Sequence, residues 1–124
     1  MRQPRPVYLN LLTIKLPLAG FVSILHRITG LILFLFIPFA LWILYHSLHS
    51  ETDFVFLTLN LKKPFFKILL WIGLSALGYH LLAGLRHLLA DLHIGTSKQG
   101  GTNSAAIVLI LAITLSTLIG YGLC

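Results

Sequence analysis

The chain has 124 residues, of which 57% are hydrophobic and only 10% are charged. Soluble domains contain about 25% charged residues, so this composition excludes an ordinary soluble domain and indicates a membrane protein. The formal net charge of +6 comes largely from basic residues that flank apolar runs. It therefore indicates membrane anchoring and orientation, and no basic patch on a soluble surface points to nucleic-acid binding.

The first 19 residues are expected to form a short cytoplasmic arm. They contain basic residues but no apolar segment followed by a small-residue cleavage site, so they do not resemble a secretory signal. They also lack the Arg-rich and Ser-rich length of a mitochondrial transit peptide, which favours a bacterial protein. A processed organellar chain is the alternative.

Three segments carry no formal charge, namely residues 28–50, 68–85 and 99–124. A helix that crosses a bilayer core needs about 20 apolar residues. The sequence therefore predicts an all-α membrane protein with helices at about 20–49, 64–93 and 103–123, in one anchor domain over residues 20–124 that forms part of a larger helix bundle. Thr102, Asn103 and Ser104 could cap the third helix after the linker GTSKQGG.

The basic residues near the helix ends predict the orientation, because cytoplasmic loops are enriched in Lys and Arg. If the N-terminus is cytoplasmic, the cytoplasmic side holds Arg2, Arg5, Lys15, Arg27, Arg86 and Lys98, and the other side holds Lys62, Lys63 and Lys67. The C-terminus, with the only cysteine, Cys124, would then be periplasmic. A single cysteine cannot form an intrachain disulfide.

On the first helix, Ser23, His26 and Arg27 have the spacing i, i+3 and i+4 and share one face. A hydroxyl, an imidazole and a guanidinium on one face can together hold a carboxylate or a quinone carbonyl. The alternative is that Arg27 extends to lipid phosphates at the membrane surface.

On the second helix, His80, Gly84 and His87 have the spacing i, i+4 and i+7 and also share a face. Neutral imidazole binds haem iron, and a glycine one turn away leaves room for a flat macrocycle. The alternative is that His80 hydrogen-bonds a neighbouring helix and Gly84 permits close packing. Three other histidines, His46, His49 and His93, lie near helix ends and are interpreted as interfacial polar residues.

A helix rises about 1.5 Å per residue, which places Arg27 and His87 in one layer about 10 Å above the cytoplasmic boundary. His80 lies about 10 Å deeper, and the same count brings Leu33 and Ser116 to its depth. Neither residue is a strong haem ligand. If His80 binds a six-coordinate haem, the opposite ligand should therefore come from another chain.

Three motifs, RPVYLN, SILHRITG and HLLAGLRHLLAD, occur in that order across the three spans. Together they resemble the cytochrome b subunit that anchors succinate dehydrogenase in bacterial and mitochondrial membranes. Ala90 departs from the family, where many relatives have a bulky or aromatic residue. The resemblance implies a four-subunit enzyme of the bacterial inner membrane, in which a flavoprotein and an iron–sulfur subunit oxidise succinate and two membrane subunits deliver the electrons to ubiquinone or menaquinone.

By position, the resemblance implies that His80 is an axial ligand of haem b, paired with a histidine of the second membrane subunit. Ser23 and Arg27 would line the quinone pocket, and His26 with Arg27 would contact the haem propionates. His87 is a further candidate contact, and Asp91, one turn away, could orient His87 or contact the soluble subunits. The alternatives are a fumarate reductase anchor and a small membrane scaffold or transporter subunit without a redox role.

Overall fold

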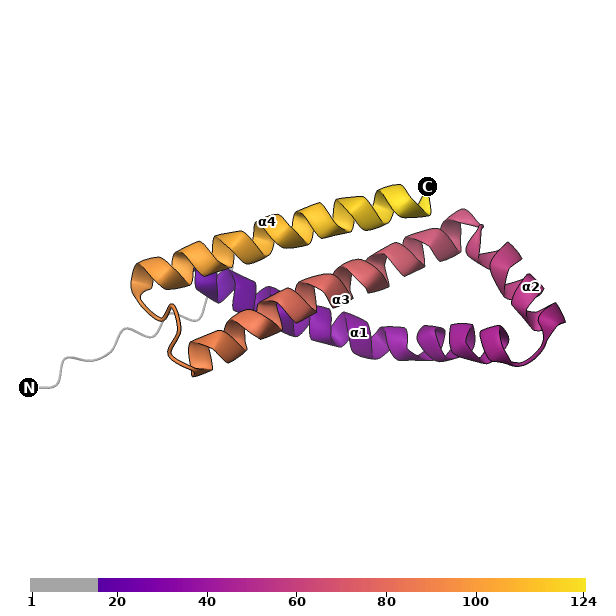
Figure 1. Cartoon of the computed structure of the whole chain (residues 1–124), viewed down its shortest axis with the longest axis horizontal. Coiled ribbons are helices and arrows are strands. Elements are labelled where there is room, and N and C mark those ends of the chain that lie inside the picture. The colour runs from indigo at the N-terminus through magenta and orange to yellow at the C-terminus, as the bar shows by residue number, and fades with distance from the viewer. Residues whose placement is uncertain (1–15) are drawn as a thin grey trace, which may run out of the picture.

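The computed structural model describes residues 16–124, and this part of the chain contains four α-helices and no strand. They are α1 (Leu18–Leu48), α2 (Glu51–Leu61), α3 (Pro64–Asp91) and α4 (Lys98–Leu123). The long helices α1, α3 and α4 form an elongated bundle, and α2 joins α1 to α3 at one end of it (Figure 1). Each of the three long helices is long and apolar enough to cross a membrane. The predicted all-α membrane fold is confirmed.

Most of the predicted N-terminal arm, including RPVYLN and the basic residues Arg2, Arg5 and Lys15, lies outside the described residues. The end of the predicted arm differs, because α1 begins at Leu18 rather than residue 20. Pro17 occupies the N-cap position, and its carbonyl accepts hydrogen bonds from the backbone N–H groups of Gly20 and Phe21. A proline at this position costs the helix no backbone hydrogen bond, because the first N–H groups of a helix have no partner within the helix.

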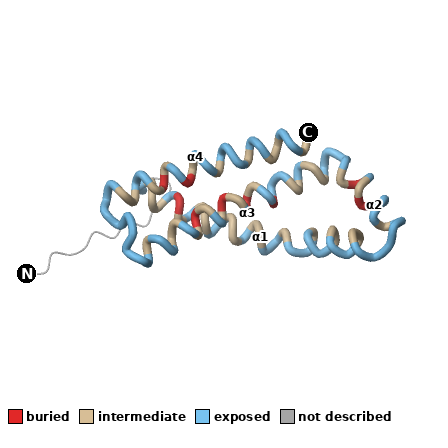
Figure 2. The backbone as a smooth tube through the Cα atoms, viewed as in Figure 1, coloured by how far each residue is buried: buried red, intermediate tan, exposed pale blue. Residues whose placement is uncertain are grey.

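The described chain buries few of its residues (Figure 2), and many of the exposed side chains are large and apolar. Phe34 and Leu35 on α1, for example, are 66% and 67% exposed. In a bilayer, lipid tails cover such side chains, and helices associate through close packing of small residues. Two small residues, Ala83 and Ala105, lie in the buried cluster, together with Val22, Tyr79 and Val108.

The segment between the first two predicted spans, residues 50–63, is mostly helical. The side chain of Ser50 caps α2 by accepting a hydrogen bond from the backbone N–H of Asp53, and both acids of the segment, Glu51 and Asp53, lie in the first turn. Negative charge there is favoured by the partial positive charge of a helix N-terminus. His46 at the end of α1 bonds the Asp53 carboxylate at 3.0 Å, which ties α2 to α1.

The predicted N-cap of the third span is wrong. α4 begins at Lys98, and the side chain of Ser97 caps it by accepting a hydrogen bond from the backbone N–H of Gly100. Gly100 and Gly101, two of the three glycines of the expected linker, therefore lie inside the helix. A side chain at Gly100 would come within 2.8 Å of the carbonyl oxygen of Gly95, so the tight approach of the preceding loop requires a glycine there.

Arg86 of α3 fastens the start of α4. Its guanidinium donates hydrogen bonds to the Ser104 hydroxyl at 3.1 Å and to the Gly101 carbonyl at 3.2 Å. These contacts hold the first turns of α4 in helical form although glycines disfavour a helix. They depend on the folded bundle, which explains why local sequence signals placed the start of this helix five residues too late.

Candidate functional site

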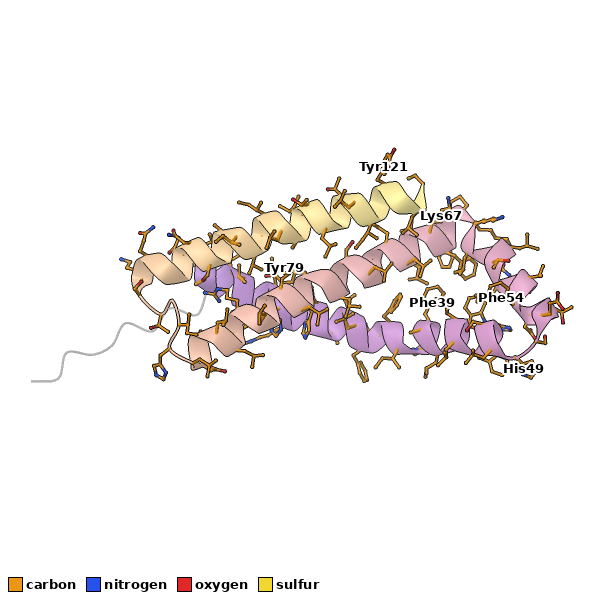
Figure 3. The ribbon with its side chains drawn as sticks, in the orientation of Figure 1. Phe39, His49, Phe54, Lys67, Tyr79 and Tyr121 are labelled. Carbon is orange, nitrogen blue, oxygen red and sulfur yellow. The ribbon has the colours of Figure 1, made fainter. Side chains whose placement is uncertain are left out.

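The candidate site lies between α1 and α3. Val22 of α1 and Ala83 of α3 are completely buried, and the small alanine lets the helices approach each other. The buried hydroxyl of Tyr79 donates a 2.8 Å hydrogen bond to the carbonyl of Val22. Tyr79 lies where the three long helices come together (Figure 3). These contacts set the register of α1 against α3 and so decide which polar residues of the two helices meet.

Three histidines meet at this crossing. The ring of His26 on α1 is stacked on that of His80 on α3, with centroids 4.0 Å apart and planes inclined by 15°. The His87 ring lies 5.1 Å from the His26 ring in a tilted arrangement. His80 and His87 of α3 therefore both lie against His26 of α1. Gly84 faces His26, because a Cβ there would lie 3.4 Å from Nε2 of His26.

His80 is held by a defined set of hydrogen bonds. Its Nδ1 lies 3.1 Å from the backbone carbonyl of His26 and 3.2 Å from the hydroxyl of Thr29. A carbonyl only accepts hydrogen bonds, so this contact requires the proton on Nδ1. In the neutral imidazole, Nε2 is then the unprotonated nitrogen, and it makes no hydrogen bond with a described residue. Histidines that bind metals commonly donate the N–H of their other nitrogen to a carbonyl in this way.

The donor set fits a haem better than a bare metal ion. The described residues contain no cluster of three or more His, Cys, Asp or Glu side chains that could hold a metal ion. A haem iron needs only axial protein ligands, because the porphyrin supplies the others. His80 offers one such ligand. His26 is not the opposite one, because stacked rings 4.0 Å apart leave no room for a macrocycle between them.

The polar residues that the sequence places near the cytoplasmic ends of the two spans do not bond one another. Ser23 is half-buried, and Arg27 and Asp91 are exposed. Within the described part of the chain, none of the three makes a side-chain hydrogen bond or an ion pair. The predicted support of His87 by Asp91 is therefore not present in this structure. Arg27 presents its guanidinium at the surface of α1, one residue from His26.

The depth count placed Leu33 and Ser116 opposite His80, and this is wrong for both. His80 faces Gly30, where a Cβ would lie 3.2 Å from Cε1 of the imidazole. Ser116 instead bonds the hydroxyl of Ser75 at 2.8 Å, about 7.5 Å along α3 from His80. A count of rise per residue assumes helices parallel to the membrane normal, whereas α1 and α3 cross at an angle (Figure 1).

Sequence reasoning missed Thr29 and Gly30, which shape the surroundings of His80. Both lie in the motif SILHRITG, three and four residues after His26, and so share its helix face. That periodicity was the available signal. The hydroxyl of Thr29 also donates to the His26 carbonyl at 2.9 Å, so one carbonyl, one hydroxyl and one imidazole form a closed set of hydrogen bonds.

The histidines at the other end of α1 belong to a different environment. His46 lies 20 residues after His26, which is about 30 Å along the helix. His46 bonds Asp53, and His49 lies 4.0 Å from the same carboxylate. Hydrogen bonds from the Ser50 hydroxyl and from His46 lower the pKa of Asp53 below its usual value. This end, where His49 and Phe54 lie (Figure 3), is separate from the candidate site.

Fold and site together define a multi-pass membrane subunit with a histidine cluster between two of its spans. A family model described as succinate dehydrogenase/fumarate reductase transmembrane subunit matches residues 1–119. The chain belongs to this family. The resemblance inferred from the three motifs and the function of a membrane-anchor cytochrome b subunit of succinate dehydrogenase are confirmed.

The similarity to curated relatives extends over nearly the whole chain. The chain is 37% identical to the succinate dehydrogenase cytochrome b556 subunit of Coxiella burnetii over 121 residues, which cover 97% of both chains. It is 33% identical to the subunit of the same name from Paracoccus denitrificans, with 94% of this chain and 90% of the relative covered. For the Rickettsia felis subunit the identity is 31%, with 93% and 90% covered.

Proposed function

We propose that this chain binds haem b and forms part of the quinone pocket of a succinate:quinone oxidoreductase in a bacterial inner membrane. The observation that carries the proposal is the hydrogen bond between His80 Nδ1 and the His26 carbonyl. It leaves the Nε2 lone pair of a neutral imidazole available to an iron ion. Family membership, and the name cytochrome b556 in relatives of similar length, support the same function.

His80 is the proposed axial ligand, and His26 and Arg27 are the proposed partners of the haem propionates, with His87 as a further contact. Arg27 carries the permanent positive charge that a propionate requires, and its guanidinium can bind a carboxylate through two hydrogen bonds. Because His26 is stacked on His80, the opposite axial ligand would come from a second membrane-anchor subunit, so the haem would be shared. When bound, the haem supplies a one-electron carrier whose potential depends on its ligands and burial.

Ser23 and Arg27 are proposed to hold a carbonyl oxygen of ubiquinone or menaquinone. Reduction of a quinone adds electrons and protons, so negative charge develops on its oxygens. Hydroxyl and guanidinium donors stabilise such charge, and a position near the membrane surface gives access to protons from water. The electrons would come from the iron–sulfur subunit, which receives them from the flavoprotein subunit. The N-terminus would then be cytoplasmic, on the side of these soluble subunits, and the C-terminus periplasmic.

The central test replaces His80 with Leu and His46 with Leu, and records reduced-minus-oxidised spectra of the purified complex. We expect the b-type signal to be lost or altered to a different spin state in the His80 variant only. His46 is the matched control, because it is a partly exposed histidine of the same chain about 30 Å from the cluster. A normal low-spin signal in the His80 variant, with loss of signal in the His46 variant, would overturn the assignment.

A further inference from the structure

The hydroxyl of Thr29 has an arrangement that close packing alone does not explain. It donates to the His26 carbonyl at 2.9 Å and lies 3.2 Å from Nδ1 of His80. The same carbonyl lies 3.1 Å from Nδ1. Because the only hydrogen of the hydroxyl points to the carbonyl, its oxygen is left to accept a hydrogen bond. The Nδ1–H of His80 is therefore shared between two acceptors, the His26 carbonyl and the Thr29 hydroxyl.

The rest of the surroundings leaves the His80 ring little freedom. Gly30 approaches Cε1 so closely that a Cβ at this position would lie 3.2 Å away, and the His26 ring covers one face of the imidazole. The ring is thus held at its edge by Gly30, on its face by His26 and at Nδ1 by two oxygens. The orientation of Nε2 follows from these contacts.

We infer that Thr29 is a positioning residue that fixes the orientation of the His80 imidazole and increases electron density at Nε2. This inference rests on the proposed role of His80 as a haem ligand. A second acceptor at Nδ1–H strengthens the ligand as a base, and a more basic ligand favours the oxidised iron. Thr29 would contact neither the iron nor the quinone and would act only through His80.

The test uses variants of Thr29 in the intact complex. Thr29→Val keeps the branched shape but removes the hydroxyl, whereas Thr29→Ser keeps the hydroxyl. The matched control is Thr114→Val, because the Thr114 hydroxyl also bonds a carbonyl of its own helix, that of Ile110, but lies on an exposed part of α4. The readouts are the midpoint potential of the b-type haem in a redox titration and the ratio of haem to flavin in the purified complex.

We expect Thr29→Val to raise the midpoint potential and to weaken haem retention by roughly tenfold, at the low end of the 10–100-fold effect of such hydrogen-bond partners on metal affinity. Thr29→Ser and Thr114→Val should keep the wild-type potential and haem content. If Thr29→Val does not assemble, Thr29→Ala, which also lacks the hydroxyl, is measured in its place, and failure of both variants to assemble counts against a positioning role.

The outcome separates this inference from the proposed function. An unchanged potential and haem content in Thr29→Val, in a complex whose haem is lost in His80→Leu, would overturn the role of Thr29 and leave His80 as the ligand. Retention of a normal haem signal in His80→Leu would overturn the proposed function itself. A shift in both Thr29→Val and Thr29→Ser would also contradict the inference, because the serine keeps the hydroxyl.

Discussion

The hydroxyl of Tyr79 on α3 donates a 2.8 Å hydrogen bond to the backbone carbonyl of Val22 on α1, and both residues are buried. This contact lies one residue from His80, so it sets the height at which His80 meets α1. A buried hydrogen bond between spans is favourable because the bilayer offers no water as an alternative partner. The hydrogen bond between Tyr79 and Val22 therefore links the packing of α1 against α3 to the geometry of the histidine cluster.

Replacement of Tyr79 with Phe should destabilise the subunit by about 1 kcal/mol, because it removes this hydrogen bond and leaves the ring in place. The measurement is the thermal unfolding midpoint of the purified complex in detergent. Tyr121→Phe is the control, since Tyr121 is 85% exposed. Equal midpoints for the two variants would show that the Tyr79 hydroxyl does not stabilise the crossing.

Ser23→Ala should slow quinone reduction by roughly tenfold or less, and Arg27→Leu by more, because a hydrogen bond to a neutral group contributes about 0.5–1.5 kcal/mol and one to a charged group about 1.5–3 kcal/mol. The assay compares quinone reduction by membranes with succinate oxidation by an artificial acceptor, which should survive both changes. Wild-type quinone kinetics in both variants would mean that this face of α1 is not part of the pocket.

A reporter fused after Cys124 should report the periplasm, because the six-to-three distribution of basic residues places the N-terminus in the cytoplasm. The matched control is a fusion after Gly95, in the connection between α3 and α4, which should report the cytoplasm. A cytoplasmic signal from the C-terminal fusion would reverse the topology and move Ser23 and Arg27 away from the soluble subunits.

His93→Gly should stabilise the subunit by about 1 kcal/mol. His93 has a φ of 60°, in the left-handed region that side chains disfavour. It follows the end of α3, where its backbone N–H bonds the Ala90 carbonyl and that of Ile94 bonds the Leu89 carbonyl, an arrangement in which glycine is usual. Gly95→Ala should destabilise the subunit, because Gly95 has a φ of 69° that an alanine side chain disfavours. The thermal midpoint measures both, and a lower midpoint for His93→Gly would indicate that the imidazole makes a contact in the assembled complex.

The three spans could be predicted from the sequence because the transfer of an apolar helix into a bilayer depends on the composition of that helix alone. The grouping of His80, Gly84 and His87 was equally predictable, since helical periodicity places them on one face. The helix α2 was overlooked, although Ser50 and Asp53 are only three residues apart and form a helix N-cap of a kind that the sequence alone can indicate. The early start of α4 was missed because Arg86 holds it from another helix.

The contacts of His80 show most clearly what helical periodicity and rise per residue cannot predict. Periodicity assigns a residue to a face of its own helix, and rise per residue assigns it a depth. Neither quantity says how two helices are rotated and tilted against each other. That relationship comes from the fit of Val22, Tyr79 and Ala83 at the crossing, and it turns His80 toward Thr29 and Gly30 rather than Leu33. Contacts between spans depend on the shapes of both helix surfaces at once, so only the tertiary structure, in which the helices are packed together, shows which residues meet.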